Sequence, residues 1–440
     1  MNLNKIFNPK TIAVIGASSS PNKVGHDIFR NLLDSKKKVH PVNPKAKKIL
    51  GMIVYKSVMD IKGKVDLAVI AVPAQTVPVV LEEVIRKKVP FTIIVSAGFS
   101  ESGEIELEQK VIGLAKDKTT ILGPNCLGII NPHKKLNVSF FNKMPKKGSI
   151  AFVSQSGALG VAMLDWAIKN NIGLSSFVSI GNAIDLEYSE LLKHMDRDKN
   201  TKAICIYMES VRHGERFLET LKSVKKPIIV LKAGKTKTGE KAAFSHTAAL
   251  ATEDAIYEGI FRQGKAVRVN TLYQLFEIAQ VHALDQQPKG KKALIITNAG
   301  GPGVIASDAF ENAGLELVDL PKHIKKELND ILPKHWSNNN PIDIIGDALP
   351  IHYKKTLNKL KNATFFDFIM VLLTPQTMTN PTEVAKELVA FNKKTKYPVF
   401  ACFMGGHQVS EARRLIKKGG ILHFMEPEYA AQVISKMVIK

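Results

Sequence analysis

The histidine at position 246 has an unusual setting. It lies in "FSHTAAL" (244–250), after the small and basic run "LKAGKTKTGEKAA" (231–243), with few bulky neighbours to cover it. An imidazole is a good nucleophile near neutral pH, and a phosphorylated histidine readily transfers its phosphoryl group. Such a histidine needs a carboxylate to orient its second nitrogen. Glu209, at the end of the apolar run "AICIYME" (203–209), is the best placed. A surface histidine and a solvated glutamate remain the alternatives at this point.

Three turns follow apolar runs and could hold phosphate groups. They are "GASSSPNKVG" (16–25), "SQSGALG" (154–160) and "NAGGPG" (298–303), and each opens a helix-length segment. Helix N-termini bind anions because their free amides and the helix dipole favour negative charge. For the first turn the alternative is an ordinary strand–helix connection, and for the second it is a simple serine N-cap.

The first turn favours coenzyme A over a nicotinamide nucleotide. It lacks the GxGxxG fingerprint, and "KKVHPVNPKAKK" (37–48) stands where a nicotinamide enzyme would place an acidic residue. This basic segment suits a ligand with a pyrophosphate and a 3′-phosphate. A nicotinamide oxidoreductase is therefore disfavoured.

Short β-branched runs alternate with amphipathic helix-length segments along the chain, as at 11–17, 149–160 and 293–303. Runs that are apolar throughout predict strands buried on both faces, and hence parallel sheets covered by helices. The pattern restarts after two polar linkers, 142–148 and 283–292. The sequence therefore predicts three α/β domains.

The composition limits the possible partners and compartments. A formal net charge of +22 suits polyanions, but the basic residues are spread in twos and threes and aromatic residues make up only 7%. This pattern disfavours nucleic-acid binding. Three cysteines without disulfide or metal spacing indicate a reducing compartment. We expect no secretory segment, no membrane span and a cytoplasmic location.

Seven segments together resemble the α subunit of the ADP-forming acyl-CoA synthetases (acetate–CoA ligases), relatives of succinyl-CoA synthetase. They are "IAVIGASSSPNKVG", "ILGPNCLGIINP", "IAFVSQSGALG", "SIGNAIDLEYSELL", "AGKTKTGEKAAFSHTAAL", "TNAGGPGVIASDA" and "NPIDIIGDA", they are ordered along the chain, and the resemblance covers essentially its whole length. The resemblance implies a Rossmann-like coenzyme A-binding domain (1–138). It also implies a flavodoxin-like ligase domain carrying the histidine loop (146–284) and a second flavodoxin-like ligase domain (291–440).

The resemblance also implies roles for single residues. His246 matches the histidine that is phosphorylated, and Glu209 matches the carboxylate that orients it. The residues implied for phosphate are Ser154, Gln155, Ser156, Gly157, Gly300, Gly301 and Gly303. The residues implied for coenzyme A are Gly16, Ala17, Ser18, Ser19, Lys23, Gly25, Lys45, Val72, Pro73, Ser96, Ala97, Gly98 and Asn125. Cys126 falls near the acyl site, where we expect it to pack. The sequence departs from the family at Ala248 and Ala249, where Gly then Ser is common and where alanine limits backbone freedom.

No segment resembles the ATP-grasp fold that binds the nucleotide in these enzymes. The resemblance therefore implies a separate ATP-grasp β subunit, ATP or ADP and Mg²⁺ bound mainly through that subunit, no metal site of this chain's own, and a hetero-oligomer such as α2β2. The implied reaction interconverts acyl-CoA, ADP and phosphate with a carboxylic acid, ATP and coenzyme A, through an acyl phosphate and a phosphohistidine. The alternative is a catalytically silent regulator that binds coenzyme A or acyl-CoA and needs neither His246 nor Glu209.

Overall fold

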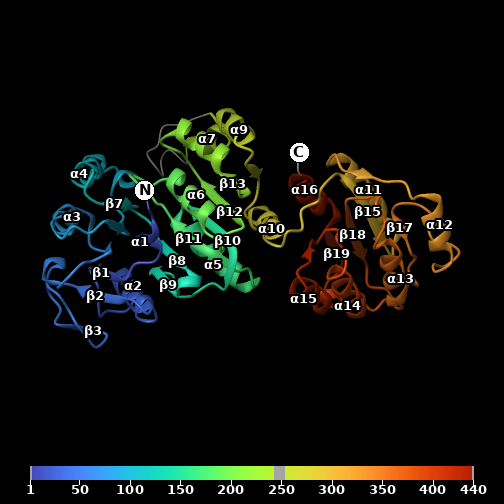
Figure 1. Cartoon of the computed structure of the whole chain (residues 1–440), viewed down its shortest axis with the longest axis horizontal. Coiled ribbons are helices and arrows are strands. Elements are labelled where there is room, and N and C mark those ends of the chain that lie inside the picture. The colour runs from blue at the N-terminus through green and yellow to red at the C-terminus, as the bar shows by residue number, and fades with distance from the viewer. Residues whose placement is uncertain (1, 242–252, 439–440) are drawn as a thin grey trace. The chain divides into compact units, whose positions relative to one another are not determined.

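The computed structural model describes residues 2–241 and 253–438. The chain divides into two compact units, Met1–Ala279 and Gln280–Lys440, which we call unit 1 and unit 2 (Figure 1). Unit 1 contains two extended sheets and unit 2 contains a third. The predicted α/β class, with parallel sheets covered by helices, is confirmed. Within the described ranges, no helix has the length and apolar character needed to cross a membrane.

The first sheet has the strand order β2-β1-β5-β6-β7 and is parallel. Its strands are β1 (Thr11–Ile15), β2 (Lys38–Val42), β5 (Leu67–Ile70), β6 (Phe91–Ile94) and β7 (Thr120–Leu122). The accompanying elements are α1 (Asn4–Phe7), α2 (Val24–Leu33), α3 (Val77–Arg86), α4 (Ile105–Ala115) and the hairpin of β3 (Lys48–Ile49) and β4 (Met52–Ile53). The order reverses between β1 and β5, which creates a crevice at their carboxyl ends.

The second sheet has the order β14-β13-β12-β10-β11-β8-β9. Its strands are β8 (Gly128–Asn131), β9 (Leu136–Ser139), β10 (Lys147–Ser154), β11 (Leu174–Ser179), β12 (Ala203–Met208), β13 (Ile228–Lys232) and β14 (Val267–Val269). Its helices are α5 (Gly157–Lys169), α6 (Tyr188–Arg197), α7 (Gly214–Ser223), α9 (Asp254–Gln263) and α10 (Leu272–Ala283). The parallel strands β11-β10-β12-β13-β14 have the flavodoxin-like order.

Strands β8 and β9 lie in a stretch that the sequence assigns to the first predicted domain, 1–138. In the structure they form an antiparallel pair that joins the second sheet through β11. The predicted boundary therefore falls within a strand of the second sheet. The three-domain boundaries themselves stay a prediction.

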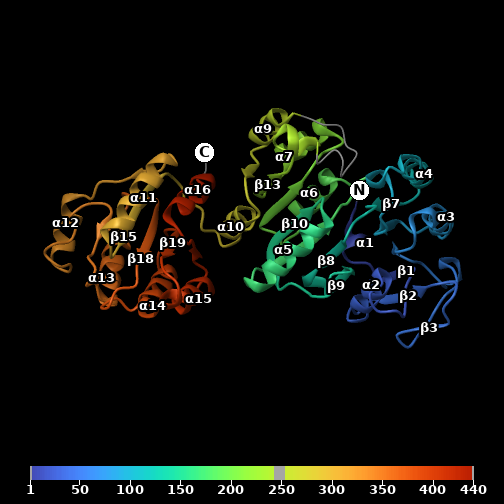
Figure 2. The same ribbon diagram turned by 180° about the vertical axis from the view of Figure 1, so that it is seen from behind.

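The sheet of unit 2 repeats the flavodoxin-like order as β16-β15-β18-β19-β20, with β17 also paired to β15. Its strands are β15 (Lys292–Thr297), β16 (Glu316–Leu317), β17 (Ile342–Asp343), β18 (Phe368–Leu373), β19 (Val399–Phe403) and β20 (Leu422–His423). Its helices are α11 (Gly300–Asn312), α12 (Lys322–Asn329), α13 (Pro350–Leu360), α14 (Pro381–Asn392), α15 (Ser410–Lys418) and α16 (Pro427–Met437). Helices α11 and α16 lie on one face of this sheet, and α13 and α14 lie on the other (Figure 2).

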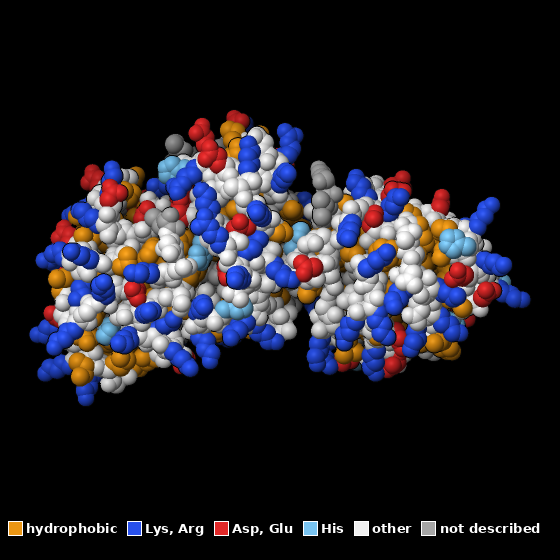
Figure 3. Space-filling view, viewed as in Figure 1, with side chains coloured by type: hydrophobic (Ala, Val, Ile, Leu, Met, Phe, Trp, Pro, Cys, Tyr) orange, Lys and Arg blue, Asp and Glu red, His pale blue; other side chains and the backbone are white. Residues whose placement is uncertain are grey.

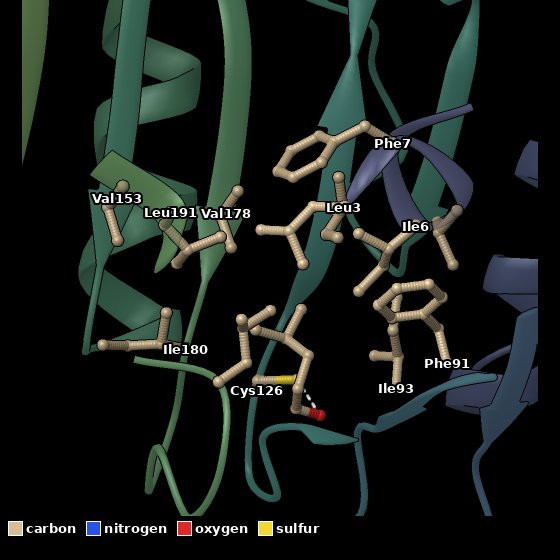
Figure 4. Close-up of a cluster of buried hydrophobic side chains, with 14 of the residues drawn as sticks. Leu3, Ile6, Phe7, Phe91, Ile93, Cys126, Val153, Val178, Ile180 and Leu191 are labelled. Atoms are coloured by element: carbon tan, nitrogen blue, oxygen red, sulfur yellow. Dashed lines mark hydrogen bonds between the residues drawn. The ribbon is translucent and has the colours of Figure 1, made fainter. Parts of the chain in front are cut away.

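One hydrophobic cluster in unit 1 spans both of its sheets. Leu3, Ile6 and Phe7, at the short helix α1, belong to the same cluster as Phe91 of β6 and Val178 of β11 (Figure 4). The ring of Phe7 also stacks on His194 of α6, with centroids 4.3 Å apart. Side chains at helix α1 thus contribute to a core that includes residues of both sheets.

The surface charge is dispersed. Figure 3 shows Lys and Arg side chains scattered over the visible face, interspersed with acidic ones, rather than gathered into one continuous field. On this face the distribution agrees with the sequence pattern of basic residues in twos and threes.

The hydrophobic cluster that includes residues of both sheets leads to a prediction about stability. Phe7→Ala should lower the free energy of unfolding of unit 1 by about 3–5 kcal/mol, because it removes a buried ring and leaves a cavity. Peptide-resolved hydrogen exchange should show faster exchange in both β6 and β11. Val79→Ala, at a side chain that is 62% exposed, is the control and should change little. Loss of protection in only one sheet would contradict a shared core.

Candidate functional site

The residues predicted for coenzyme A all lie at one edge of the first sheet. Residues 16–25 follow β1, Lys45 follows β2, residues 72–73 follow β5, residues 96–98 follow β6 and Asn125 follows β7. Parallel strands place all these turns at their carboxyl ends, where open α/β sheets bind ligands. The fold therefore brings the predicted set together at one edge.

Two glycines in the first turn are required by close backbone packing. Gly16 has φ +89°, and a Cβ there would lie 2.3 Å from the carbonyl oxygen of Ala71. A Cβ at Gly25 would lie 2.0 Å from the carbonyl oxygen of Gly16. The turn after β1 is thus pressed against the end of β5 and against the start of α2, and no other residue fits at either position.

Asn182 joins the turns after β6 and β7 to the second sheet. Its Nδ2 donates to Glu101 Oε2 at 2.6 Å and to Glu108 Oε2 at 2.8 Å, and its Oδ1 accepts from Asn125 Nδ2 at 3.3 Å. Glu108 is 3% exposed and also receives Arg212 Nη2 at 3.1 Å. Because Arg212 lies three residues after Glu209, one polar network connects the predicted coenzyme A turns with the loop that follows Glu209.

Gln155, in the turn after β10, holds the Glu209 loop. Its Oε1 accepts from the backbone N–H of Glu209 at 2.8 Å and of Ser210 at 3.1 Å, and from the hydroxyl of Tyr188 at 3.1 Å. Its Nε2 donates to Ser210 Oγ at 3.2 Å. The side chain is therefore engaged within the protein, and sequence reasoning, which grouped Gln155 with the phosphate residues, missed this supporting contact.

The neighbouring serines of the turn have different environments. Ser154 is fully buried, and its Oγ donates to the carbonyl oxygen of Ser156 at 2.7 Å. Ser156 is the N-cap of α5, where its Oγ accepts from Leu159 N–H at 3.3 Å. The N-cap alternative for this turn is thus correct as local structure. It is compatible with anion binding, because Gly157 and the first turn of α5 still present backbone amides.

Glu209 sits at the end of β12, as predicted, beside two groups that shape its surroundings. Tyr207 Oη donates to Glu209 Oε1 at 3.4 Å. Burial, and then the charge of Glu209, raise the pKa of the Tyr207 phenol well above its usual value, so the phenol stays a proton donor.

Lys232, at the end of β13, lies over the ring of Tyr257, with Nζ 4.5 Å from the ring centroid, and burial lowers the pKa of the Lys232 amine. Lys232 was not singled out from sequence, since its burial depends on Tyr257 of α9.

A pocket of about 560 Å³ in unit 1 joins the turns of the two sheets. It is lined by Val72, Ser96, Ala97 and Asn125 of the coenzyme A set and by Gln155, Ser156 and Gly157 of the phosphate set. Ser154 and the predicted residues at 16–25, 45, 73 and 98 do not line it. Cys126 lines it too, and burial raises the pKa of that thiol to about 12.

The glycine-rich turn of unit 2 forms the N-terminus of α11. A Cβ at Gly301 would meet no atom within 4 Å, and a Cβ at Gly300 would lie 3.4 Å from Asp343 Oδ2. Asn298 fixes the turn, because its Nδ2 donates to Thr374 O and its Oδ1 accepts from Thr374 N–H, both at 2.9 Å. The turn therefore lies between β15 and β18, where the strand order of this sheet reverses.

His246, Ala248 and Ala249 lie outside the described residues, so the predicted pairing of His246 with Glu209 stays a prediction. Across residues 2–241 and 253–438, no group of three or more His, Cys, Asp or Glu residues is arranged to hold a metal ion.

Three family models match the chain in order. They are described as a CoA binding domain at residues 10–132, a succinyl-CoA ligase like flavodoxin domain at 147–282 and a ligase-CoA domain at 293–434.

Two named relatives are similar in sequence over 99% of this chain. Subunit alpha of acetate–CoA ligase (ADP-forming) II of Pyrococcus furiosus is 39% identical over 99% of this chain and 97% of its own length. Acetate–CoA ligase (ADP-forming) of Methanocaldococcus jannaschii is 43% identical over 99% of this chain, which spans 63% of that longer relative. A solved structure of Ca. Korarchaeum cryptofilum dinucleotide forming acetyl-coenzyme A synthetase 1, in complex with phosphate and ADP, matches with TM-score 0.94 and 37% identity, covering 99% of this chain and 96% of that one.

The cysteines should be inert in the folded protein. Cys126, Cys205 and Cys402 are all buried free thiols, and burial raises the pKa of each, to about 12 for Cys126 and for Cys402. The thiolate is the reactive form. We expect no reaction with Ellman's reagent at pH 8 in buffer and complete reaction in urea. Rapid labelling of Cys126 in the native chain would show that the pocket is open to water at its sulfur.

Gln155→Leu should loosen the Glu209 loop. It leaves two backbone amides without their acceptor, at about 1–3 kcal/mol for each group that stays buried. Hydrogen exchange of residues 209–210 should accelerate. Gln109→Leu, at an exposed position of α4, is the matched control. Unchanged exchange at residues 209–210 would mean that Gln155 does not hold the loop.

Proposed function

This chain belongs to the family of ADP-forming acetate–CoA ligases, and we propose that it is the subunit that binds coenzyme A and carries the phosphorylated histidine. The reaction interconverts acyl-CoA, ADP and phosphate with a carboxylic acid, ATP and coenzyme A. The observation that carries this proposal is the pocket in which Asn125 and the turn at 96–97 face Ser156 and Gly157. A thioester held by the first sheet then meets phosphate held by the start of α5.

The first step is attack of a phosphate oxygen on the thioester carbonyl. A bond forms between that oxygen and the carbonyl carbon, the carbon–sulfur bond breaks, and coenzyme A leaves as a thiolate that takes up a proton. The amides at Ser156 and Gly157 and the dipole of α5 hold the phosphate and stabilise its charge. Gly300, Gly301 and Gly303 supply a second phosphate-binding turn at the start of α11.

The second step transfers the phosphoryl group to His246. An imidazole nitrogen attacks the phosphorus, the bond from phosphorus to the acyl oxygen breaks, and the carboxylate leaves. Glu209 accepts a hydrogen bond from the other ring nitrogen and stabilises the cationic imidazole. In the last step ADP takes the phosphoryl group from His246 to give ATP.

The nucleotide, with its Mg²⁺, binds mainly to a separate ATP-grasp β subunit in a hetero-oligomer such as α2β2. Two kinds of relative support this division. One is named as an alpha subunit and has nearly the length of this chain, whereas the other is a single chain of which this one spans 63%. We place the enzyme in the cytoplasm, because its three cysteines are free thiols.

Labelling of His246 tests the proposal. The chain is co-purified with an ATP-grasp partner and given ATP labelled in its γ-phosphate together with Mg²⁺. We expect an acid-labile, base-stable label that is lost on adding ADP and is absent in His246→Ala. Glu209→Gln should reduce the rate of labelling by about 10²–10⁴-fold if the carboxylate acts on the imidazole.

His323→Ala, at an exposed histidine of α12, is the matched control and should be labelled like the wild type. Labelling that persists in His246→Ala would remove His246 from the mechanism. An assembled complex that binds coenzyme A and never becomes labelled would favour the silent regulator instead.

A further inference from the structure

A larger pocket of unit 1 lies at the opposite edge of its two sheets from the coenzyme A and phosphate turns. Its volume is about 1160 Å³, and it is lined by Lys10, just before β1, by Asp66, just before β5, and by Ser176, near the start of β11. These positions are at the amino ends of parallel strands, whereas the turns of the candidate functional site follow the carboxyl ends. We call this cavity the amino-end pocket. None of its lining residues belongs to the sets predicted for coenzyme A or phosphate.

The amino-end pocket has a surplus of positive charge. Among the described residues, seven Lys and Arg side chains line it, against three Asp and Glu side chains. Asp66 pairs with Lys5 at 3.6 Å, and Glu190 pairs with Arg216. The third carboxylate, Asp198, accepts hydrogen bonds from the two residues that follow Lys199. The five remaining cations form no ion pair with another described residue, and they are Lys10, Lys134, Lys193, Arg197 and Lys199.

The carbonyl groups at the end of α6, which would repel an anion, are compensated by a lysine. A helix C-terminus carries partial negative charge on its free carbonyl oxygens. Lys226, which lies beyond α7, donates from Nζ to the carbonyl oxygen of Met195 at 2.8 Å and to that of Asp198 at 2.6 Å. Lys193 and Arg197 add two cations to the same part of the helix. The end of α6 therefore presents positive charge to the pocket.

Two polar side chains in the inner part of the lining have no protein partner in the described ranges. Ser176 is 4% exposed and shares with Val178 the side of β11 that faces α1 (Figure 4), and its hydroxyl makes no hydrogen bond to a described residue. The ring nitrogens of His194, whose ring stacks on Phe7, make none either. Burial lowers the pKa of the His194 imidazole, so the ring is neutral at pH 7 and one nitrogen carries a hydrogen to donate. Because buried polar groups are usually hydrogen-bonded, these two indicate a ligand with acceptor atoms.

We propose that the amino-end pocket binds a small molecule that carries a di- or triphosphate group. The five cations that lack an ion pair would neutralise its phosphate oxygens, while Ser176 and His194 would donate to the innermost ones. Such a ligand would contact Lys10 beside the first sheet and α6 beside the second, and would thus stabilise unit 1. The inference does not rest on the proposed function, because no residue of this pocket takes part in that reaction.

Calorimetric titration of the purified full chain with sodium tripolyphosphate, without Mg²⁺, tests the inference. Lys193→Gln combined with Arg197→Gln should weaken binding by at least about 10-fold, because two full charges beside the phosphate groups are lost. Lys222→Gln combined with Lys225→Gln is the matched control. It removes the same net charge from exposed positions that do not line the pocket, and it should change the affinity by less than about 2-fold.

Ser176→Ala separates a ligand-binding role from a structural one. It should weaken tripolyphosphate binding by about 3-fold or more, because one hydrogen bond to the ligand is lost. The midpoint of thermal unfolding without the ligand should stay unchanged or rise, since no hydrogen bond within the described protein is removed. Unchanged affinity in this variant would mean that water, and not the ligand, meets the hydroxyl, and it would contradict the inner half of the proposed site.

ATP, titrated in the same way, distinguishes the two sources of such a phosphate group. A nucleoside triphosphate as ligand requires that ATP binds more tightly than tripolyphosphate, and a bare phosphate chain requires that it does not. In either case the Lys193 and Arg197 double variant must weaken binding more than its control.

Three results would overturn the inference. One is the absence of tripolyphosphate and ATP binding to the folded chain. Another is an equal loss of affinity in the double variant and its control, which would indicate general attraction to a basic protein. The third is binding that survives the double variant and is lost in Lys45→Gln, which would place the anion at the coenzyme A turns. Failure of His246 labelling would contradict the proposed function and leave these results untouched.

Discussion

The pocket of unit 1 that joins the turns of the two sheets depends on the close contact between residues 121–125, at the end of β7 in the first sheet, and residues 181–186, which follow β11 of the second sheet. The backbone N–H groups of Asn182, Ile184 and Leu186 donate to carbonyl oxygens of 121–124 at 3.0 to 3.2 Å. Gly181 has φ +55°, and a Cβ there would lie 2.1 Å from the carbonyl oxygen of Pro124. Two separately wound sheets are thereby joined by main-chain bonds that do not depend on side-chain adjustment.

Because of this junction, turns from both sheets line one pocket. Each sheet alone has a crevice at the carboxyl ends of its strands. The crevice of the first sheet is proposed for coenzyme A, and that of the second sheet for phosphate. The junction brings Asn125 and Ser156 into one cavity, and the buried network around Asn182 and Glu108 stiffens it. Reacting groups held in this way gain from proximity, because little orientational freedom is left to lose in the reaction.

Several features of the fold and of the candidate site could be predicted from the sequence, because each depends on residues close together in the chain. Buried β-branched runs, the Gly16 turn, the Ser156 cap and the position of Glu209 at a strand end follow from patterns within about ten residues. The contacts that the sequence did not reveal are between residues far apart in the chain. Gln155 supports an amide 54 residues away, and Lys232 meets an aromatic ring on a later helix. Strands β8 and β9 join the second sheet although they precede the polar linker that the sequence uses as a boundary, since pairing with β11 is invisible to local pattern.

The setting of Glu209 bears on its proposed pairing with His246. Glu209 is held through its own backbone by Gln155, and its carboxylate receives the Tyr207 hydroxyl, so its direction is set before any imidazole approaches. A carboxylate that must first be oriented would lose part of its interaction energy to that ordering. The strand end, the glutamine and the phenol therefore act as one preorganised acceptor. In the proposed mechanism the imidazole of His246 then meets a carboxylate whose direction is already set.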